Sequence, residues 1–229
     1  MNNFKLSTLG LLAAGGLAFS LQASSAALMI DDFLDPGSYV KSFSSTMATT
    51  GAINLVNGTD LTGATRELQA TSLTGGVSSA LGTSIFAGEG FLSISNDTGV
   101  TGTASAIYNF SDTDLTGGGI LTALLLDVES IDLSTQVKIS LGDGTNTSVS
   151  DYQSFDGPGT FFNLLSGFGG VDVASANYIR LDFKGATAWD GRFTFLATNE
   201  PPTIPEPATL GLFGIGLLGF AASRFRKAA

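Results

Sequence analysis

The chain has 229 residues, of which 43% are hydrophobic and only 13% are charged, and its formal net charge is −10. It contains no cysteine and no histidine, which excludes disulfides, thiolate nucleophiles, Cys/His zinc sites and any catalytic triad with a histidine base. The acidic excess argues against nucleic acid as a partner, because nucleic acid is itself a polyanion. Neutral glycans, cations and other proteins remain open as partners.

The first 26 residues have the composition of a secretory signal peptide. A single charge at Lys5 precedes an apolar stretch from Leu6 to Leu21, and small residues follow it. Cleavage is predicted after Ala26 or Ala27, so the Sec translocon and signal peptidase are expected partners. The alternative is an uncleaved membrane anchor, but the apolar stretch is short for a span and is interrupted by glycine.

Residues 27–198 are expected to form one domain, which is long enough to bury a substantial core. Residues 27–203 carry 19 acidic and six basic side chains, a net charge of −13. The dominant hydrophobic period is two, and Gly, Asn, Asp, Ser and Thr separate the alternating stretches. We predict nine or ten strands, at 28–33, 53–56, 66–73, 91–95, 103–110, 120–128, 137–141, 159–165, 179–184 and 192–196.

Residues 120–128 form the most hydrophobic of these stretches and are predicted to be a central strand buried on both faces. A helix is the competing interpretation, because periodicity cannot decide for an apolar run of this length. No other segment of the domain has a helical period flanked by caps, and no internal repeat is visible. We therefore predict an all-β fold, an antiparallel β-sandwich that resembles a jelly roll.

Carboxylates are the only plentiful reactive groups in the chain. A glycosidase would need two of them about 5 to 9 Å apart, one with a raised pKa, and the sequence singles out no such pair. Most aspartates stand beside glycine, asparagine or serine, as turn residues do. We therefore predict no catalytic residue, and a secreted glycoside-active enzyme is the most remote of three hypotheses.

A structural calcium ion is the one cofactor that the sequence suggests, because calcium prefers hard oxygen ligands. Asp31 and Asp32 lie near the first predicted strand, and Asp182 and Asp190 lie near the last. A sandwich commonly brings its terminal strands together, which would let these carboxylates meet. No D-x-D-x-D-G calcium loop supports the hypothesis.

Trp189 is the only tryptophan. With Tyr178, Tyr152 and Tyr39 it could form a platform on which sugar rings stack; the alternative is an aromatic of the core or of a sheet edge. The segment 182–195 is loosely similar to the closing strands of carbohydrate-binding jelly rolls, a likeness of fold that does not establish function. A carbohydrate-binding module is therefore the second hypothesis for the domain.

Two further segments follow the predicted domain. Residues 199–203 are predicted to form a stiff spacer with two prolines. Residues 204–229 form the second segment, which contains an apolar run and has a basic end. A transmembrane helix is predicted for residues 208–223. Its fifteen positions up to Ala222 extend roughly 22 Å, so spanning a hydrocarbon core of ~30 Å requires basic side chains that snorkel or a thinner bilayer. The alternative is a buried core helix.

The tripeptide Pro205, Glu206 and Pro207 precedes this helix, and the tail 224–229 follows it. Prolines on both sides of the glutamate disfavour helix and hold the backbone extended, which is the form that a protease cleft grips. Positive charge after a span stays cytoplasmic, so the domain would lie on the far side of the membrane. The basic residues of the tail are Arg224, Arg226 and Lys227.

The tripeptide, the short glycine-rich helix and the basic tail together resemble the PEP-CTERM sorting signal of Gram-negative bacteria. The resemblance covers about a tenth of the chain. It implies a transient inner-membrane anchor, cleavage near Glu206 by an exosortase, a membrane-embedded enzyme that resembles cysteine transpeptidases, and delivery to the cell surface or the exterior. It also implies a host that makes exopolysaccharide. The leading hypothesis is therefore a non-enzymatic envelope or extracellular matrix protein associated with exopolysaccharide or biofilm.

Overall fold

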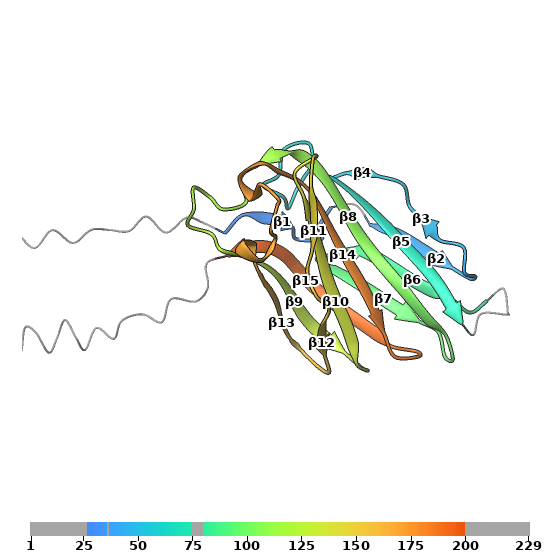
Figure 1. Cartoon of the computed structure of the whole chain (residues 1–229). Coiled ribbons are helices and arrows are strands. Elements are labelled where there is room, and N and C mark those ends of the chain that lie inside the picture. The colour runs from blue at the N-terminus through green and yellow to red at the C-terminus, as the bar shows by residue number, and fades with distance from the viewer. Residues whose placement is uncertain (1–26, 36, 75–79, 200–229) are drawn as a thin grey trace, which may run out of the picture.

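The computed structural model describes residues 27–35, 37–74 and 80–199, which form two β-sheets packed face to face (Figure 1). Two short 3-10 helices, η1 (Leu165–Gly167) and η2 (Val173–Ser175), lie near one edge. The strands are β1 (Met29–Asp31), β2 (Ser38–Ser42), β3 (Ala48–Thr49), β4 (Ile53–Asn54), β5 (Thr65–Thr74), β6 (Thr83–Gly88), β7 (Phe91–Asn96), β8 (Thr101–Thr113), β9 (Ala123–Ile131), β10 (Thr135–Gly142), β11 (Thr147–Val149), β12 (Gln153–Phe155), β13 (Gly159–Leu164), β14 (Ala176–Gly185) and β15 (Asp190–Asn199).

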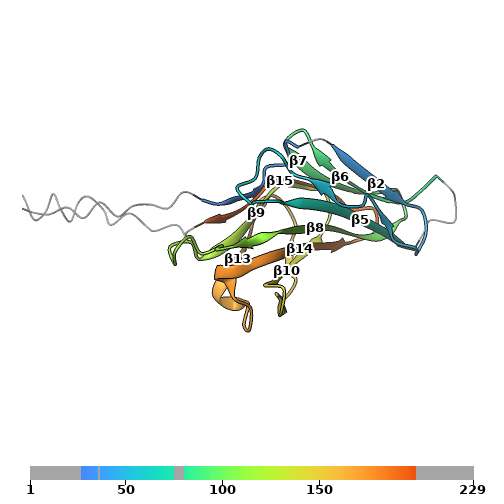
Figure 2. The same ribbon diagram turned by 90° about the horizontal axis from the view of Figure 1, so that it is seen from above.

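The two sheets are antiparallel throughout and form the two layers visible in Figure 2. Sheet A has the strand order β13-β9-β15-β7-β6-β2, and β1 pairs with β15. Sheet B has the order β11-β10-β14-β8-β5-β3, with β12 paired to β10 and β4 paired to β5. The predicted antiparallel β-sandwich is confirmed.

Each of the ten predicted strands corresponds to an observed one, and the helix considered for residues 120–128 does not form. The chain is extended from Ala123, and β9 lies between β13 and β15. The expectation that this strand is buried on both faces is wrong. Leu124 and Leu126 face the core, whereas Leu125 and Asp127 alternate with them and are only half-buried. The reason is that, among the described residues, no further layer covers the outer side of sheet A.

Five strands were missed, namely β2, β3, β6, β11 and β12. Most are two or three residues long, and β2 places Ser38 and Ser42 on its buried side. Their hydroxyls have partners there, because Ser38 accepts a hydrogen bond from Arg66 and Ser42 donates to backbone carbonyls. Inward serines weaken the hydrophobic alternation on which strand prediction depends.

The core lies between the sheets and is built from the inward-facing half of each strand. Phe183 of β14 and Phe193 of β15 meet across it, with ring centroids 4.9 Å apart. Other fully buried members come from both layers, among them Ile85, Leu92, Leu126 and Phe161 of sheet A and Leu68, Tyr108, Ile139 and Leu181 of sheet B.

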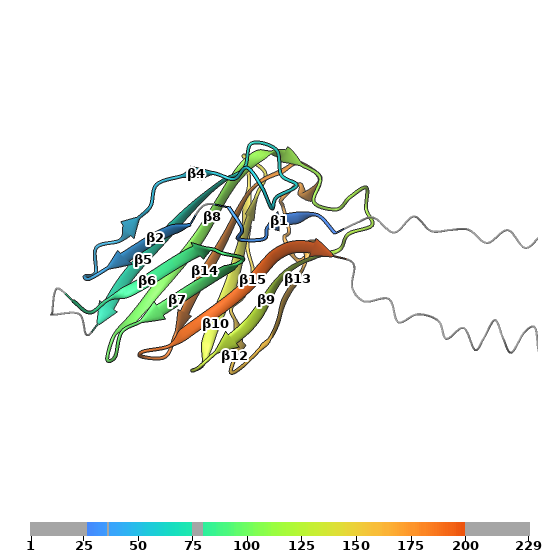
Figure 3. The same cartoon turned by 180° about the vertical axis from the view of Figure 1, so that it is seen from behind.

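The first and the last strand of the described domain lie side by side. Strand β1 pairs with β15, with Met29 opposite Ala197. Leu28 and Thr198 exchange hydrogen bonds: the Leu28 N–H donates to Thr198 Oγ1 at 3.1 Å, and the Thr198 N–H donates to the Leu28 carbonyl at 2.9 Å. Figure 3 shows β1 beside the end of β15 from behind. The expectation that the terminal strands meet is thus confirmed.

Strand β15 runs to Asn199, so the strand includes the first residue of the spacer predicted for 199–203. The predicted signal peptide and the segment from residue 200 onward, which includes the sorting signal and its helix, lie outside the described residues. Within the part of the chain that the structure describes, no helix is long and apolar enough to cross a membrane.

Candidate functional site

Trp189 cannot serve as a sugar-stacking platform, because its side chain is 0% exposed. It precedes β15 and packs against the end of β14. A Cβ atom at Gly185 would lie 2.6 Å from Trp189 Cδ1, so the glycine makes room for the indole. The Trp189 carbonyl also accepts a hydrogen bond from Asn96 Nδ2 at 3.0 Å. The platform hypothesis for Trp189 is therefore wrong, and the alternative, an aromatic residue of the core, is what the structure shows.

The predicted tyrosines do not gather around one site. Tyr39 is 59% exposed on the outer side of β2 in sheet A. Tyr178 is half-buried and lies opposite Gly142, at one end of β10. Tyr152 directly precedes β12, which pairs with the other end of β10. Of these residues, Tyr152 is the one that lines a cleft.

This cleft lies at the open edge of the sandwich, where the edge strands of both sheets come close. One wall is the β11–β12 segment of sheet B, and the other is formed by β13 of sheet A and η1. Its volume is about 550 Å³. The lining residues are Val149, Ser150, Asp151, Tyr152, Gln153, Phe162, Asn163, Gly167 and Phe168.

The cleft combines aromatic surface with neutral polar groups. Tyr152 and Phe162 are 37% and 36% exposed, and the amides of Gln153 and Asn163 supply both donors and acceptors. Two cations hold the tyrosine ring, since Lys184 Nζ lies 3.8 Å and Lys138 Nζ 5.0 Å from its centroid. A cleft that combines polar groups with aromatic surface is suited to binding a small polar ligand.

The cleft offers no acid/base pair, because Asp151 is the one carboxylate among its lining residues. Elsewhere on the surface, hydrogen bonds lower the pKa values of carboxyl groups. The Gln69 amide does so for Glu67, Lys41 for Asp97 and the Thr116 hydroxyl for Asp114. A general acid requires the opposite shift. These groups are therefore suited to structural roles.

The four aspartates predicted to bind calcium do not converge. Asp182 lies on the outer side of β14, where Arg180 Nε is 2.7 Å and Lys138 Nζ is 3.7 Å away. Asp190 starts β15 and accepts from the Asn96 N–H at 3.1 Å. Within the described ranges, no group of three or more Asp, Glu, His or Cys residues is placed to hold a metal ion. The predicted calcium site is therefore not formed by these residues.

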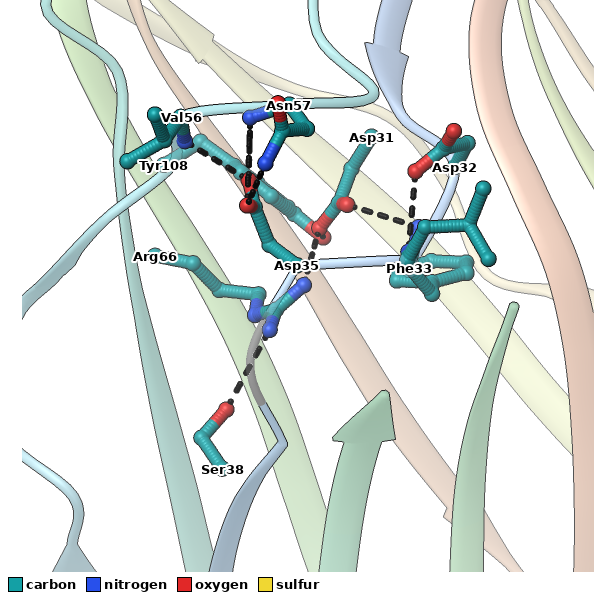
Figure 4. A network of polar contacts seen from close by, with 10 residues as sticks. Asp31, Asp32, Phe33, Asp35, Ser38, Val56, Asn57, Arg66 and Tyr108 are labelled. Carbon is teal, nitrogen blue, oxygen red and sulfur yellow. Dashed lines mark hydrogen bonds and ion pairs between the residues drawn. The ribbon is translucent and has the colours of Figure 1, made fainter. Parts of the chain in front are cut away.

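The other two aspartates lie at the end of β1 and in the turn that follows it, shown in Figure 4. Asp32 accepts the Leu34 N–H at 2.8 Å. Asp31 lies inside the sandwich and pairs with Arg66 of β5, with Oδ2 2.7 Å from Nη1. Tyr108 donates to the same oxygen at 3.1 Å, and the Phe33 N–H donates to Oδ1 at 2.8 Å. Asp31 is thus used in a buried network.

Burial governs the protonation equilibria of this network. It raises the pKa of the Asp31 carboxyl, and the Arg66 guanidinium together with the Phe33 and Tyr108 hydrogen bonds offsets part of that rise. Burial and the neighbouring carboxylate also raise the pKa of Tyr108. The Arg66 and Asp31 side chains are 0% and 1% exposed. The network ties β1 to β5 and β8 across the two sheets and presents no surface to a ligand.

The fold defines the class of the described domain: a two-sheet antiparallel β-sandwich with a cleft at one edge. Among solved structures it is similar to a family 11 carbohydrate-binding module from Clostridium thermocellum in complex with a mixed-linked tetrasaccharide (13% identity, 77% of this chain, 98% of the other, TM-score 0.42). It is also similar to a family 30 module of a cellulase of the same organism (13%, 77% and 99%, 0.37) and to an exo-beta-agarase (12%, 78% and 25%, 0.41). At these identities the likeness concerns the fold alone.

The C-terminal segment has a specific match. The family of the PEP-CTERM protein-sorting motif matches residues 203–227, which confirms the resemblance found in the sequence. The chain therefore carries a PEP-CTERM protein-sorting motif, a signal that indicates export from a Gram-negative cell with processing by an exosortase. The match concerns the sorting signal and does not reach the sandwich domain. None of the curated proteins compared with the chain matches it.

Proposed function

We propose that the protein is a non-enzymatic component of the cell envelope or extracellular matrix, associated with exopolysaccharide. A cleaved signal peptide at 1–26 directs it through the inner membrane, and the helix at 208–223 holds it there. An exosortase then cuts near Glu206 and displays or releases the domain. The observation that supports this proposal is the match of residues 203–227 to the PEP-CTERM motif.

The position of the domain boundary agrees with such processing. The last strand, β15, ends at Asn199, and the matched motif begins at residue 203. A cut near Glu206 therefore leaves every strand of the sandwich intact. The edge cleft supports binding in preference to catalysis, because it holds a single carboxylate.

Intact mass and cell fractionation in a Gram-negative host that carries an exosortase test this proposal. The wild type is expected outside the inner membrane, without residues 1–26 and without the residues after the motif. A Glu206→Ala variant is expected to stay in the membrane fraction. Glu200→Ala is the matched control, because Glu200 also precedes a proline but lies upstream of the motif. A wild type that keeps its C-terminal helix and stays in the membrane would overturn the proposal.

A second candidate function is carbohydrate binding in the edge cleft. It is supported by the half-exposed rings of Tyr152 and Phe162 beside the amides of Gln153 and Asn163. Glycan-array binding should be lost in a Tyr152→Ala variant. It should persist in Tyr178→Ala, because Tyr178 does not line the cleft. Equal binding by both variants and the wild type would count against the cleft.

A further inference from the structure

The solvent face of sheet A carries a straight row of side chains from five neighbouring strands. In the observed register Tyr39 of β2 is opposite Phe86 of β6, and Phe86 is opposite Ser93 of β7. Ser93 is opposite Arg192 of β15, which is opposite Ser130 of β9. Four steps between strands of about 4.8 Å make the row roughly 19 Å long.

The row points away from the core, because four of its five members alternate with a buried residue and the fifth, Ser130, is itself exposed. Val40, Ile85, Leu92 and Phe193 are the inward neighbours, and all of them are buried. By contrast, Tyr39 is more than half exposed. Phe86 and Phe91 are half-buried on the same face.

The Phe86 ring of the row packs against Phe91, which lies next to the row on β7. The Phe86 and Phe91 ring centroids are 5.5 Å apart. Arg192 Cζ lies 3.8 Å from the Phe91 centroid, so the guanidinium extends the aromatic surface toward β9.

A hollow of about 380 Å³ continues the row at its β15–β9 end. Its lining surface is more apolar than polar, and hydroxyl groups, carboxylates and one guanidinium supply hydrogen-bond donors as well as acceptors. The polar residues involved are Ser93, Ser95, Ser130, Asp132, Asp190 and Arg192.

The charges on this face are predominantly negative. Strands of sheet A carry two basic residues, and both are paired: Lys41 Nζ lies 2.7 Å from Asp97 and Arg192 Nε lies 2.7 Å from Glu129. The hollow adds two carboxylates, and residues 27–203 have a net charge of −13. An anionic ligand would be repelled, whereas an uncharged one fits the surface.

We propose that this face binds a neutral polysaccharide whose chain lies across β2, β6, β7 and β15. Sugar rings have apolar faces and hydroxyl edges, which match the aromatic row and the serine-lined hollow in turn. The faces pack on Tyr39, Phe86 and Phe91, and the hydroxyls bond to groups of the hollow. The inference rests on the proposed function, since an exported matrix protein meets such chains outside the cell.

Affinity electrophoresis of the full-length protein, purified in mild detergent, tests the inference. Gels contain a mixed-linkage glucan, a xylan, a galactomannan or the acidic polysaccharide alginate. At least one neutral polysaccharide should retard the wild type, and alginate should not. The double variant Phe86→Ala/Phe91→Ala should lose about tenfold or more in affinity, because two stacking surfaces are removed. Export is not needed for this assay, so failed binding and failed sorting are separate results.

Matched controls separate this face from the rest of the molecule. Val56→Ala removes an exposed apolar side chain from the loop after β4 and should leave retardation unchanged. Thermal melting confirms that each variant is folded. No retardation in any neutral polysaccharide would overturn the inference. So would unchanged retardation of the folded double variant, or a loss seen only in Tyr152→Ala, which would place binding in the edge cleft.

Discussion

Two arginine–carboxylate pairs in this protein have the same length and very different surroundings. Arg66 and Asp31 lie 2.7 Å apart between the sheets, with side chains 0% and 1% exposed. Arg192 and Glu129 also lie 2.7 Å apart, but on the outer side of sheet A, and both are 45% exposed. The comparison teaches that burial, and not contact distance, decides which pair matters for folding and which is available to a ligand.

The physical reason is the cost of removing charge from water. A buried ion left without its partner keeps the whole desolvation cost, whereas an exposed one is rehydrated. Variants of Arg66 therefore test how much the buried pair contributes to the stability of the fold. Arg192 can be changed with little loss of stability, so a loss of binding in its variants can be assigned to the surface itself.

Removing one member of the buried pair should have the largest effect. Arg66→Ala is expected to lower the free energy of unfolding by about 3–5 kcal/mol, because Asp31 is left charged and buried. Urea unfolding measures this difference. A loss below that of an ordinary surface variant would mean that the two pairs are equivalent after all.

Replacing both members should restore most of that loss. In Asp31→Leu/Arg66→Met both charges are gone, so no ion remains buried. The Phe33 N–H and the Tyr108 hydroxyl lose their acceptor, at about 1 kcal/mol each. The double variant should thus unfold within about 2 kcal/mol of the wild type. Stability equal to that of Arg66→Ala alone would contradict the desolvation account.

Removing a member of the exposed pair should change stability little but should weaken binding. Arg192→Ala should cost less than about 1 kcal/mol in urea unfolding. It should nevertheless weaken retardation by the neutral polysaccharide, since the guanidinium covers Phe91 and lines the hollow. Lys41→Ala is the control, because Lys41 also belongs to a surface pair but does not line the hollow. Equal binding losses in both variants would indicate a general charge effect.

An exposed carboxylate that binds backbone groups should give the smallest effect, visible through pH. Three backbone N–H groups, those of Thr145, Asn146 and Asp172, donate to Asp143 at 2.7–2.8 Å and lower its pKa to about 2. A lowered acid pKa stabilises the fold above the ordinary aspartate range, and this stability is lost as pH falls toward 2. The Tm of Asp143→Asn should therefore approach that of the wild type on acidification. Parallel Tm curves would refute this role.

Local patterns in the sequence predicted most of the fold. Ile179, Leu181 and Phe183 alternate with Arg180, Asp182 and Lys184, and β14 has the core face and the polar face that this alternation requires. Where polar residues face inward, as in β2, the alternation is weak and the strand was missed. The sorting tripeptide 205–207 is also a local signal, which needs no folded partner to be recognised in sequence.

The candidate sites were predicted less well, because they depend on register and burial. Trp189 was selected for its residue type, and only the packing around Gly185 shows that it is buried. Tyr152 was also selected for its residue type, and its partner in the cleft, Phe162, comes from the other sheet. The outward position of Phe86, next to the inward Ile85, was the one signal that could have pointed to the row.

By itself, the sequence determined the strand class, the acidic charge, the absence of cysteine and histidine chemistry and the sorting signal, since each is a property of composition or of neighbouring residues. Tertiary structure alone decided that Asp31 meets Arg66 and that Tyr39, Phe86, Ser93, Arg192 and Ser130 form one row. A shift of one residue in strand pairing turns every side chain to the other face. Long-range pairing of the strands therefore selects which residues become core and which become surface.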